Sequence, residues 1–178
     1  MKKKPTLRNK ILFIELDDIV VNFSEELNKR VNNWGFMNES IKENALVEIS
    51  QNDPNFYRNL SPIDCAIESI NTLCDFYDIY FLSSPYSGIP SIYKDKRIWL
   101  EKHFGEKFRE KLILTHRKDL QVGHYLIDRN LNNGSDKFIN DLLLFGSDTF
   151  KNWEQIVRYL VDKYEVFWPE TFKPKFRE

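Results

Sequence analysis

Short apolar runs separated by stretches of helical periodicity constrain the fold of this chain more than any other feature. Each run has the length and composition of a buried parallel strand. The runs are residues 10–16, 79–82, 112–114, 125–127 and 142–145. Between them, apolar residues recur at helical spacing over 62–75, 92–104 (with Gly105 as its expected stop) and 151–164. Strands that alternate with helices predict an α/β protein whose parallel sheet is covered on both faces, with its chemistry at the carboxyl ends of the strands.

One segment interrupts this alternation. Between residues 23 and 59 no strand pattern appears, and polar helical stretches are broken near the sequence QNDPN. An insertion of this size after the first strand would form a small helical cap over the strand ends. We therefore expect a core of residues 1–22 and 60–178 and a cap of residues 23–59, together forming a single structural unit.

Composition and charge exclude several classes of protein. A chain of 178 residues fits one domain with a small insertion. Its net charge of −1 gives no reason to expect nucleic-acid or membrane binding, and no apolar run approaches the ~20 residues of a membrane span. Cys65 and Cys74 have no metal-ligand spacing, so we expect reduced, partly buried thiols in a cytoplasmic protein.

Three acidic residues directly follow the first apolar run. Glu15, Asp17 and Asp18 would be costly to bury unless they met a cation or hydrogen-bond donors. The alternative is a solvated turn whose acids cap a helix. Taken alone, the pattern leaves these two interpretations equally open.

Polar residues also follow the later runs. Ser83 and Ser84 come after the second run, Lys118 after the third and Asp128 after the fourth. Hydroxyls and amides at a strand-to-helix turn suit a phosphate group, although each signal alone is typical of an ordinary turn, loop or helix cap. Together they form an ordered series of acids, hydroxyl, lysine and acid, one at the end of each successive strand.

This series resembles the four motifs of the haloacid dehalogenase superfamily, and most closely its 5′(3′)-deoxyribonucleotidase branch. The branch has DMDGVLADF, a TSP turn, K-x-x-WV-x-x-x-FG, LTRDK-T, LLIDD and a W-E pair. This chain has ELDDIVVNF, LSSPYSG, KRIWLEKHFG, LILTHRKDL, YLIDRN and NWEQI. The similarity runs from about Ile11 to Leu160 and implies a Rossmann-like core with a cap inserted after the first strand.

The resemblance also implies roles for individual residues. In the family, the first Asp of the DxD motif attacks phosphorus, and the second is the general acid and base. These positions are Glu15 and Asp17 in this chain. The implied phosphate-binding residues are Ser83, Ser84, Lys96 and Lys118. The implied ligand is a nucleoside monophosphate or phosphate.

The implied cofactor is Mg²⁺, and here the chain departs from the family. By position the metal ligands would be Glu15, Asp17 and Asp128, but Arg129 stands where the branch normally has its metal-binding acid. Glu15 adds a methylene group to the nucleophile, and Arg129 adds a permanent positive charge. Asp18 also replaces a glycine.

Two interpretations of these departures stay open. In one, Glu15 pairs with Arg129, whose guanidinium replaces the metal, and the pocket binds phosphate but barely hydrolyses it. In the other, Asp18 or Asp128 retains a displaced metal, and a slow phosphatase survives. We favour impaired hydrolysis, with a non-catalytic nucleotide-binding or interaction protein on the same fold as the alternative.

Aromatic residues of the expected cap could form a pocket for the base. Phe23, Trp34 and Phe56 are the candidates, and the alternative for each is packing inside the cap. The C-terminal stretch 165–178 is aromatic and contains prolines. It could pack on the core or contact a second subunit in a homodimer, and the sequence leaves both open.

Overall fold

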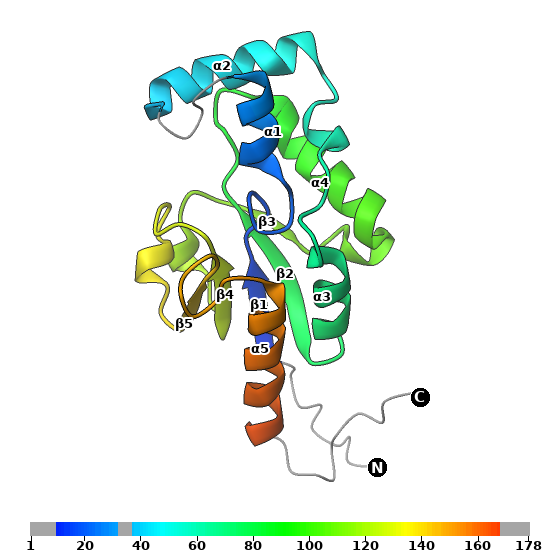
Figure 1. Cartoon of the computed structure of the whole chain (residues 1–178), viewed down its shortest axis with the longest axis vertical. Coiled ribbons are helices and arrows are strands. Elements are labelled where there is room, and N and C mark those ends of the chain that lie inside the picture. The colour runs from blue at the N-terminus through cyan, green and yellow to red at the C-terminus, as the bar shows by residue number, and fades with distance from the viewer. Residues whose placement is uncertain (1–9, 32–36, 168–178) are drawn as a thin grey trace.

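A computed structural model describes residues 10–31 and 37–167 of the chain. Its five strands form one parallel sheet in the order β3-β2-β1-β4-β5 (Figure 1). The strands are β1 Lys10–Ile14, β2 Tyr77–Ser83, β3 Leu112–Leu114, β4 Tyr125–Asp128 and β5 Asp141–Leu144. β1 lies at the centre, where Ile14 is in register with Phe81 of β2 and with Ile127 of β4. The predicted parallel sheet is confirmed.

Helices fill most of the connections between the strands. The α-helices are α1 Phe23–Arg30, α2 Glu39–Asn52, α3 Ala66–Leu73, α4 Pro90–Phe104 and α5 Trp153–Phe167. Short 3₁₀ helices are η2 Tyr57–Asn59, η3 Glu106–Phe108, η4 Lys118–Leu120 and η5 Ser135–Lys137. α4 begins with Pro90 and ends before Gly105, whose φ of 81° suits glycine, so the predicted stop is confirmed.

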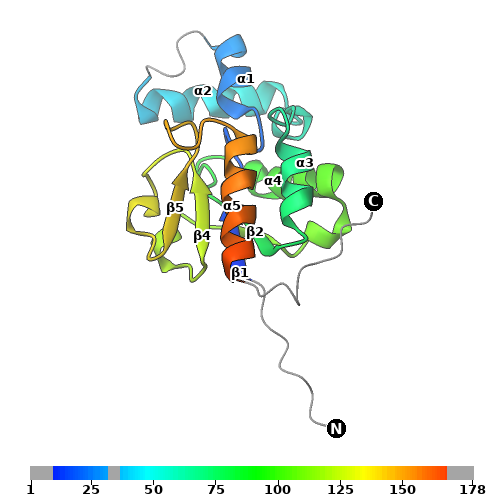
Figure 2. The same cartoon turned by 60° about the horizontal axis from the view of Figure 1, so that its bottom comes forward.

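The two faces of the sheet are covered differently. Tyr77, Ile79 and Phe81 of β2 face a large core that includes buried residues of α3, α4 and α5. The Tyr77 hydroxyl donates to the Leu160 carbonyl at 2.6 Å and so holds α5 against the sheet (Figure 2). The opposite face carries a small cluster that includes Phe13. There the connections before and after β4 form only η4, η5 and loops, so coverage of the sheet is less even than the sequence predicted.

The two cysteines are free, and the environment of one of them, Cys65, differs from the expectation. Cys65 is exposed and precedes α3 in the left-handed conformation, with φ of 62°. Cys74 is partly buried, as expected. α3 is therefore shorter than the predicted 62–75, because its first turn is preceded by an irregular link from the cap segment.

Helices α1 and α2 lie beyond the carboxyl ends of the strands (Figure 1). α2 is capped by Asn38, whose side chain accepts a hydrogen bond from the Ile41 amide at 2.9 Å. In the described part of segment 23–59 the regular elements are the helices α1, α2 and η2, while its role as a cap stays a prediction. Within the described ranges, no helix combines the length and apolarity needed to cross a membrane.

Candidate functional site

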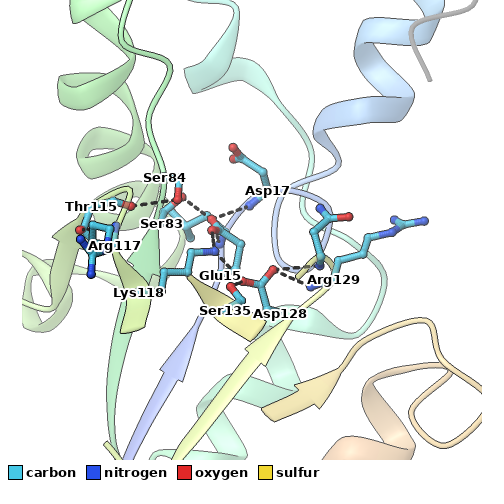
Figure 3. A network of polar contacts seen from close by, with 12 residues as sticks. Glu15, Asp17, Ser83, Ser84, Thr115, Arg117, Lys118, Asp128, Arg129 and Ser135 are labelled. Atoms are coloured by element: carbon cyan, nitrogen blue, oxygen red, sulfur yellow. Dashed lines mark hydrogen bonds and ion pairs between the residues drawn. The ribbon is translucent and has the colours of Figure 1, made fainter. Parts of the chain in front are cut away.

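Four polar residues from different parts of the chain meet at the carboxyl edge of the sheet (Figure 3). Glu15 follows β1, Ser83 ends β2, Lys118 begins η4 after β3, and Asp128 ends β4. Each of them is at most 7% exposed. Because parallel strands bring their carboxyl ends to one edge, the sequence predicted this convergence, and the structure confirms it.

Glu15 is surrounded by hydrogen-bond donors. One of its carboxylate oxygens accepts from the Leu16 amide at 2.8 Å and from the Ser83 hydroxyl, and the other is paired with the Lys118 ammonium group. Burial acts to raise the pKa of Glu15, but the positive charges of Lys118 and Lys96 and the hydrogen bonds outweigh it and lower the pKa. Glu15 is therefore held as a carboxylate anion.

Lys118 bridges two acids. Its ammonium group contacts Glu15 and lies 2.5 Å from an oxygen of Asp128, which also accepts from the Ser135 hydroxyl at 2.5 Å. Burial acts to lower the pKa of Lys118, but the charges of the two acids raise it overall. Sequence reasoning missed Ser135, which is 1% exposed, because nothing in its surroundings in the sequence marks it as a partner of Asp128.

Asp17 belongs to a second group of contacts. One oxygen accepts from the Tyr57 hydroxyl at 2.6 Å and the other from Lys96 at 2.7 Å. Lys96 also donates to the Ser83 hydroxyl oxygen at 2.7 Å, which joins the two groups. Burial raises the pKa of Asp17, and the negative charge of Glu15 adds to this, against the opposing effect of Lys96. Sequence reasoning missed Tyr57 as a partner of Asp17.

Asp18 has a local structural role. Its φ is 61°, a left-handed conformation that glycine adopts freely and that Asp tolerates better than most residues. Its carboxylate accepts from the Ser24 amide at 2.7 Å and from the Ser24 hydroxyl at 2.5 Å. Asp18 thus binds the first turn of α1.

Arg129 does not pair with Glu15, so the interpretation in which its guanidinium replaces the metal beside Glu15 is wrong. Its side chain is exposed and points away from Glu15, and its backbone amide donates to Asp128 at 2.7 Å (Figure 3). Within residues 10–31 and 37–167, the cations that pair with Glu15 and Asp17 are Lys118 and Lys96. β4 ends at Asp128, whose side chain lies in the site, and Arg129 follows beyond the strand with an exposed side chain.

A cavity of about 370 Å³ lies above this cluster, within the size range of small-ligand pockets. Glu15, Asp17, Lys118 and Asp128 are among the residues that line its base. Ser84 also lines it, although its hydroxyl donates to the Thr115 carbonyl at 2.9 Å.

Two aromatic rings line the same cavity on the side of α1. Phe23 stacks on Tyr86 with ring centroids 5.6 Å apart. Phe56 is not among the residues that line the cavity, and its ring packs against that of Phe23 with centroids 6.3 Å apart. Trp34, the third aromatic candidate, lies outside the described residues. The structure thus places Phe23 at the cavity and adds Tyr86, which the sequence did not single out.

The chain matches known proteins over most of its length. Residues 9–164 match the family model described as 5′ nucleotidase, deoxy (pyrimidine), cytosolic type C protein. A protein of Vibrio phage KVP40 named "Putative 5'(3')-deoxyribonucleotidase" is 32% identical over 154 residues, which cover 86% of this chain and 85% of the phage protein. The human "5'(3')-deoxyribonucleotidase, cytosolic type" is 32% identical over 77 residues, which cover 42% of this chain and 38% of the human protein.

Solved structures share the fold. The "putative HAD-hydrolase YfnB" from Bacillus subtilis, whose crystal form was bound to magnesium, superposes with a TM-score of 0.58 at 13% identity over 86% of this chain and 99% of YfnB. The haloacid dehalogenase-like protein SP0104 from Streptococcus pneumoniae gives 0.55 at 10% identity, over 90% of this chain and 99% of SP0104. These similarities confirm the predicted α/β fold.

Proposed function

The chain belongs to the 5′ nucleotidase, deoxy (pyrimidine), cytosolic type C family of the haloacid dehalogenase superfamily, and from this premise we propose that it binds nucleoside monophosphates but hydrolyses them poorly. One observation carries the proposal. Glu15, Ser83, Lys118 and Asp128 follow four different strands and meet beneath a cavity large enough for a small ligand. A structural ion-pair network would not need such a cavity above it.

The phosphate group would lie at the base of the cavity. Lys118, which lines the cavity, and Ser83, which is buried beside Glu15 and is not in the cavity wall, would donate to phosphate oxygens, and Lys96 donates in turn to the Ser83 oxygen. The base would lie against the ring pair of Phe23 and Tyr86, since aromatic faces stack on nucleobases. In this arrangement Asp17 is the general acid, and its raised pKa favours that role because more of it stays protonated.

Hydrolysis is impaired in this proposal because of Glu15. A carboxylate that attacks phosphorus must be free and correctly placed, whereas Glu15 is bound by the Leu16 amide, Ser83 and Lys118. Its extra methylene shifts the carboxylate relative to an aspartate, and misplacement by roughly 1 Å can cost ~100-fold in rate. Tight hydrogen bonding also lowers its nucleophilicity, as its lowered pKa indicates.

The residues present do not fit the magnesium site expected for the family. Mg²⁺ binds carboxylate and carbonyl oxygens, yet Glu15 and Asp128 both pair with Lys118, and the side chain of Arg129 leads away from them. Among the described residues, no group of three or more acidic, histidine or cysteine side chains is arranged to hold a metal. We therefore assign the positive charge near the phosphate to Lys118 and Lys96 and derive no step through a metal.

A second candidate is binding without turnover. The same observation favours it, because the ion pairs of Lys118 with Glu15 and Asp128 would stabilise a site that holds an anion without attacking it. The two candidates differ only in whether residual hydrolysis is measurable.

The test combines binding and turnover. The full chain is titrated with a panel of 5′- and 3′-monophosphates of nucleosides and deoxynucleosides, and phosphate release is measured with and without Mg²⁺. We expect binding of at least one nucleotide and weak or absent release. Glu15→Asp, which removes the extra methylene, should raise phosphate release about 100-fold. Arg129→Asp alone should leave it unchanged, because the side chain at this position points away from Glu15. Robust turnover by the unchanged chain would contradict impaired hydrolysis, and failure to bind any nucleotide would contradict the proposed function.

A further inference from the structure

The donors around Glu15 are those that bind a phosphate group. They comprise the backbone amide of Leu16 at 2.8 Å, the more distant amide of Asp17 at 3.5 Å, the Ser83 hydroxyl and the Lys118 ammonium group. Amides at the end of a strand, a hydroxyl and a lysine are a typical anion-binding set. We call these four groups the anion cradle.

Glu15 contacts every group of the cradle. Ser83 has a single hydroxyl proton, and because it donates this proton to Glu15 while its oxygen accepts from Lys96, it has none left for another anion. Lys118 is shared between Glu15 and Asp128. Both Ser83 and Lys118 are at most 2% exposed, so water does not compete for them as it would at the surface.

A phosphate and the Glu15 carboxylate cannot share these donors. The Ser83 hydroxyl and the Leu16 amide each have one hydrogen to donate, and Glu15 accepts both. Lys118 already lies between two carboxylates, so a third anion there would add to their mutual repulsion. A ligand phosphate would therefore have to move the carboxylate out of the cradle and replace its hydrogen bonds. The cavity lies directly above, since Glu15 itself lines it, so the side chain has space to enter.

We infer that the Glu15 carboxylate is an internal competitor that occupies the anion cradle, so that a phosphate group binds this site only by displacing it. The ligand class is a phosphate monoester or inorganic phosphate. This inference rests on the proposed function only in taking the nucleotide's phosphate as the natural ligand. It gives Glu15 a role different from that of a nucleophile, because the residue sets how tightly the site binds phosphate.

The experiment compares inorganic phosphate binding, by phosphorus nuclear magnetic resonance titration in EDTA, across four forms of the full chain. These are the unchanged chain, Glu15→Ala, Glu15→Gln and the control Glu101→Ala. Glu101 is a matched control. It is a carboxylate on α4 that pairs with two arginines, Arg97 and Arg109, and it is not among the residues that line the cavity. Glu15→Ala leaves Lys118 paired with Asp128, so no buried cation is left alone. Glu15→Gln keeps the shape of the side chain and serves if the alanine variant does not fold.

We expect Glu15→Ala to bind phosphate at least about 10-fold more tightly than the unchanged chain, Glu15→Gln to show a smaller gain and Glu101→Ala no change. Equal or weaker binding by the folded Glu15 variants would overturn the inference. The nucleotide titration of the unchanged chain separates this result from the proposed function. Nucleotide binding without a gain in the Glu15 variants defeats only the inference. A gain without nucleotide binding by any form defeats only the proposed function, and no binding of either ligand by any form defeats both.

Discussion

Two carboxyl groups on the same loop, Glu15 and Asp17, are separated by one residue and are held in opposite ways. Lys118, Ser83 and a backbone amide stabilise the charge of Glu15, and its pKa is lowered despite burial. Asp17 is partly buried and also has a lysine partner, Lys96, yet burial and the nearby charge of Glu15 raise its pKa. The loop therefore carries one fixed anion and one acid that holds its proton more readily.

The difference shows how environment, rather than residue type, separates the roles of two acids. Paired carboxyls with pKa values shifted apart are typical of sites that divide acid and base work. Here the two acids differ in what binds them. Glu15 accepts hydrogen bonds from the Leu16 amide, Ser83 and Lys118, whereas Asp17 has the raised pKa that suits a general acid. In the proposed function, the site would combine a general acid, Asp17, with a carboxylate, Glu15, that competes for the phosphate position.

The largest expected effect follows from removing the cation that fixes Glu15. Lys118→Met leaves Glu15 and Asp128 buried without their ion-pair partner, which should destabilise the protein by about 3–5 kcal/mol. Urea unfolding measures this. Lys94→Met, on the exposed surface of α4, is the control and should change stability by less than about 0.5 kcal/mol. Similar losses of unfolding free energy in both variants would contradict a stabilising role for the ion pairs of Lys118 with Glu15 and Asp128.

The next effect concerns Asp17. Tyr57→Phe removes the hydroxyl that donates to it at 2.6 Å, and a hydrogen bond to a charged group contributes about 1.5–3 kcal/mol. Because this hydrogen bond lowers the pKa of Asp17, its loss should raise the pKa further. Unfolding and nuclear magnetic resonance titration of the carboxyl group measure the two effects. Tyr93→Phe, on α4, is the matched control, since Tyr93 is 39% exposed; a pKa of Asp17 that falls in Tyr57→Phe would contradict the assignment.

The pH dependence of stability should separate the two acids by sign. Glu15 has a lowered pKa, so its contribution is complete above its ordinary value of 4.5 and is lost as the pH falls through the folded pKa. Asp17 has a raised pKa, so its contribution is present below its ordinary value of 3.8 and is lost as the pH rises through the folded pKa. On acidification from pH 7, Glu15→Gln should lose less stability than the unchanged chain, and Asp17→Asn should lose more. Unfolding curves at several pH values test this. Equal losses of stability on acidification in the two variants would contradict the opposite pKa shifts of Glu15 and Asp17.

The smallest effect is expected at Arg129. Its guanidinium is exposed and forms no ion pair in the part of the chain that the structure describes, so Arg129→Ala should change the free energy of unfolding by less than about 0.5 kcal/mol. The same urea titration measures it. A loss comparable to that of Lys118→Met would restore the idea that Arg129 supplies the positive charge for Glu15.

The sequence predicted the parts of this site that follow from strand order. Polar residues at the ends of successive parallel strands must meet at one edge, which is why Glu15, Ser83, Lys118 and Asp128 were found together. The direction of Arg129 was missed because it depends on the residue at which β4 ends. Tyr57 and Ser135 were missed because they reach the site by tertiary packing, from η2 and η5, and no local pattern fixes that distance.

The fold, like the site, was predicted only in part from the sequence. Periodicity located the strands and the three helices of the core, because burial imposes it on every residue of an element. It could not predict the unequal coverage of the sheet. Short 3₁₀ helices such as η4 and η5 leave no apolar repeat that the sequence could show.

The most direct test of the account is a crystal structure of the chain before and after soaking with phosphate and Mg²⁺. Without phosphate, we expect the Glu15 carboxylate in the cradle, bonded to the Leu16 amide and Ser83. With phosphate, we expect the anion on Ser83 and Lys118, the Glu15 side chain turned into the cavity and Lys118 still beside Asp128. A metal ion bound between Glu15 and Asp128, with Lys118 displaced and Glu15 pointing at the phosphorus atom, would contradict the account.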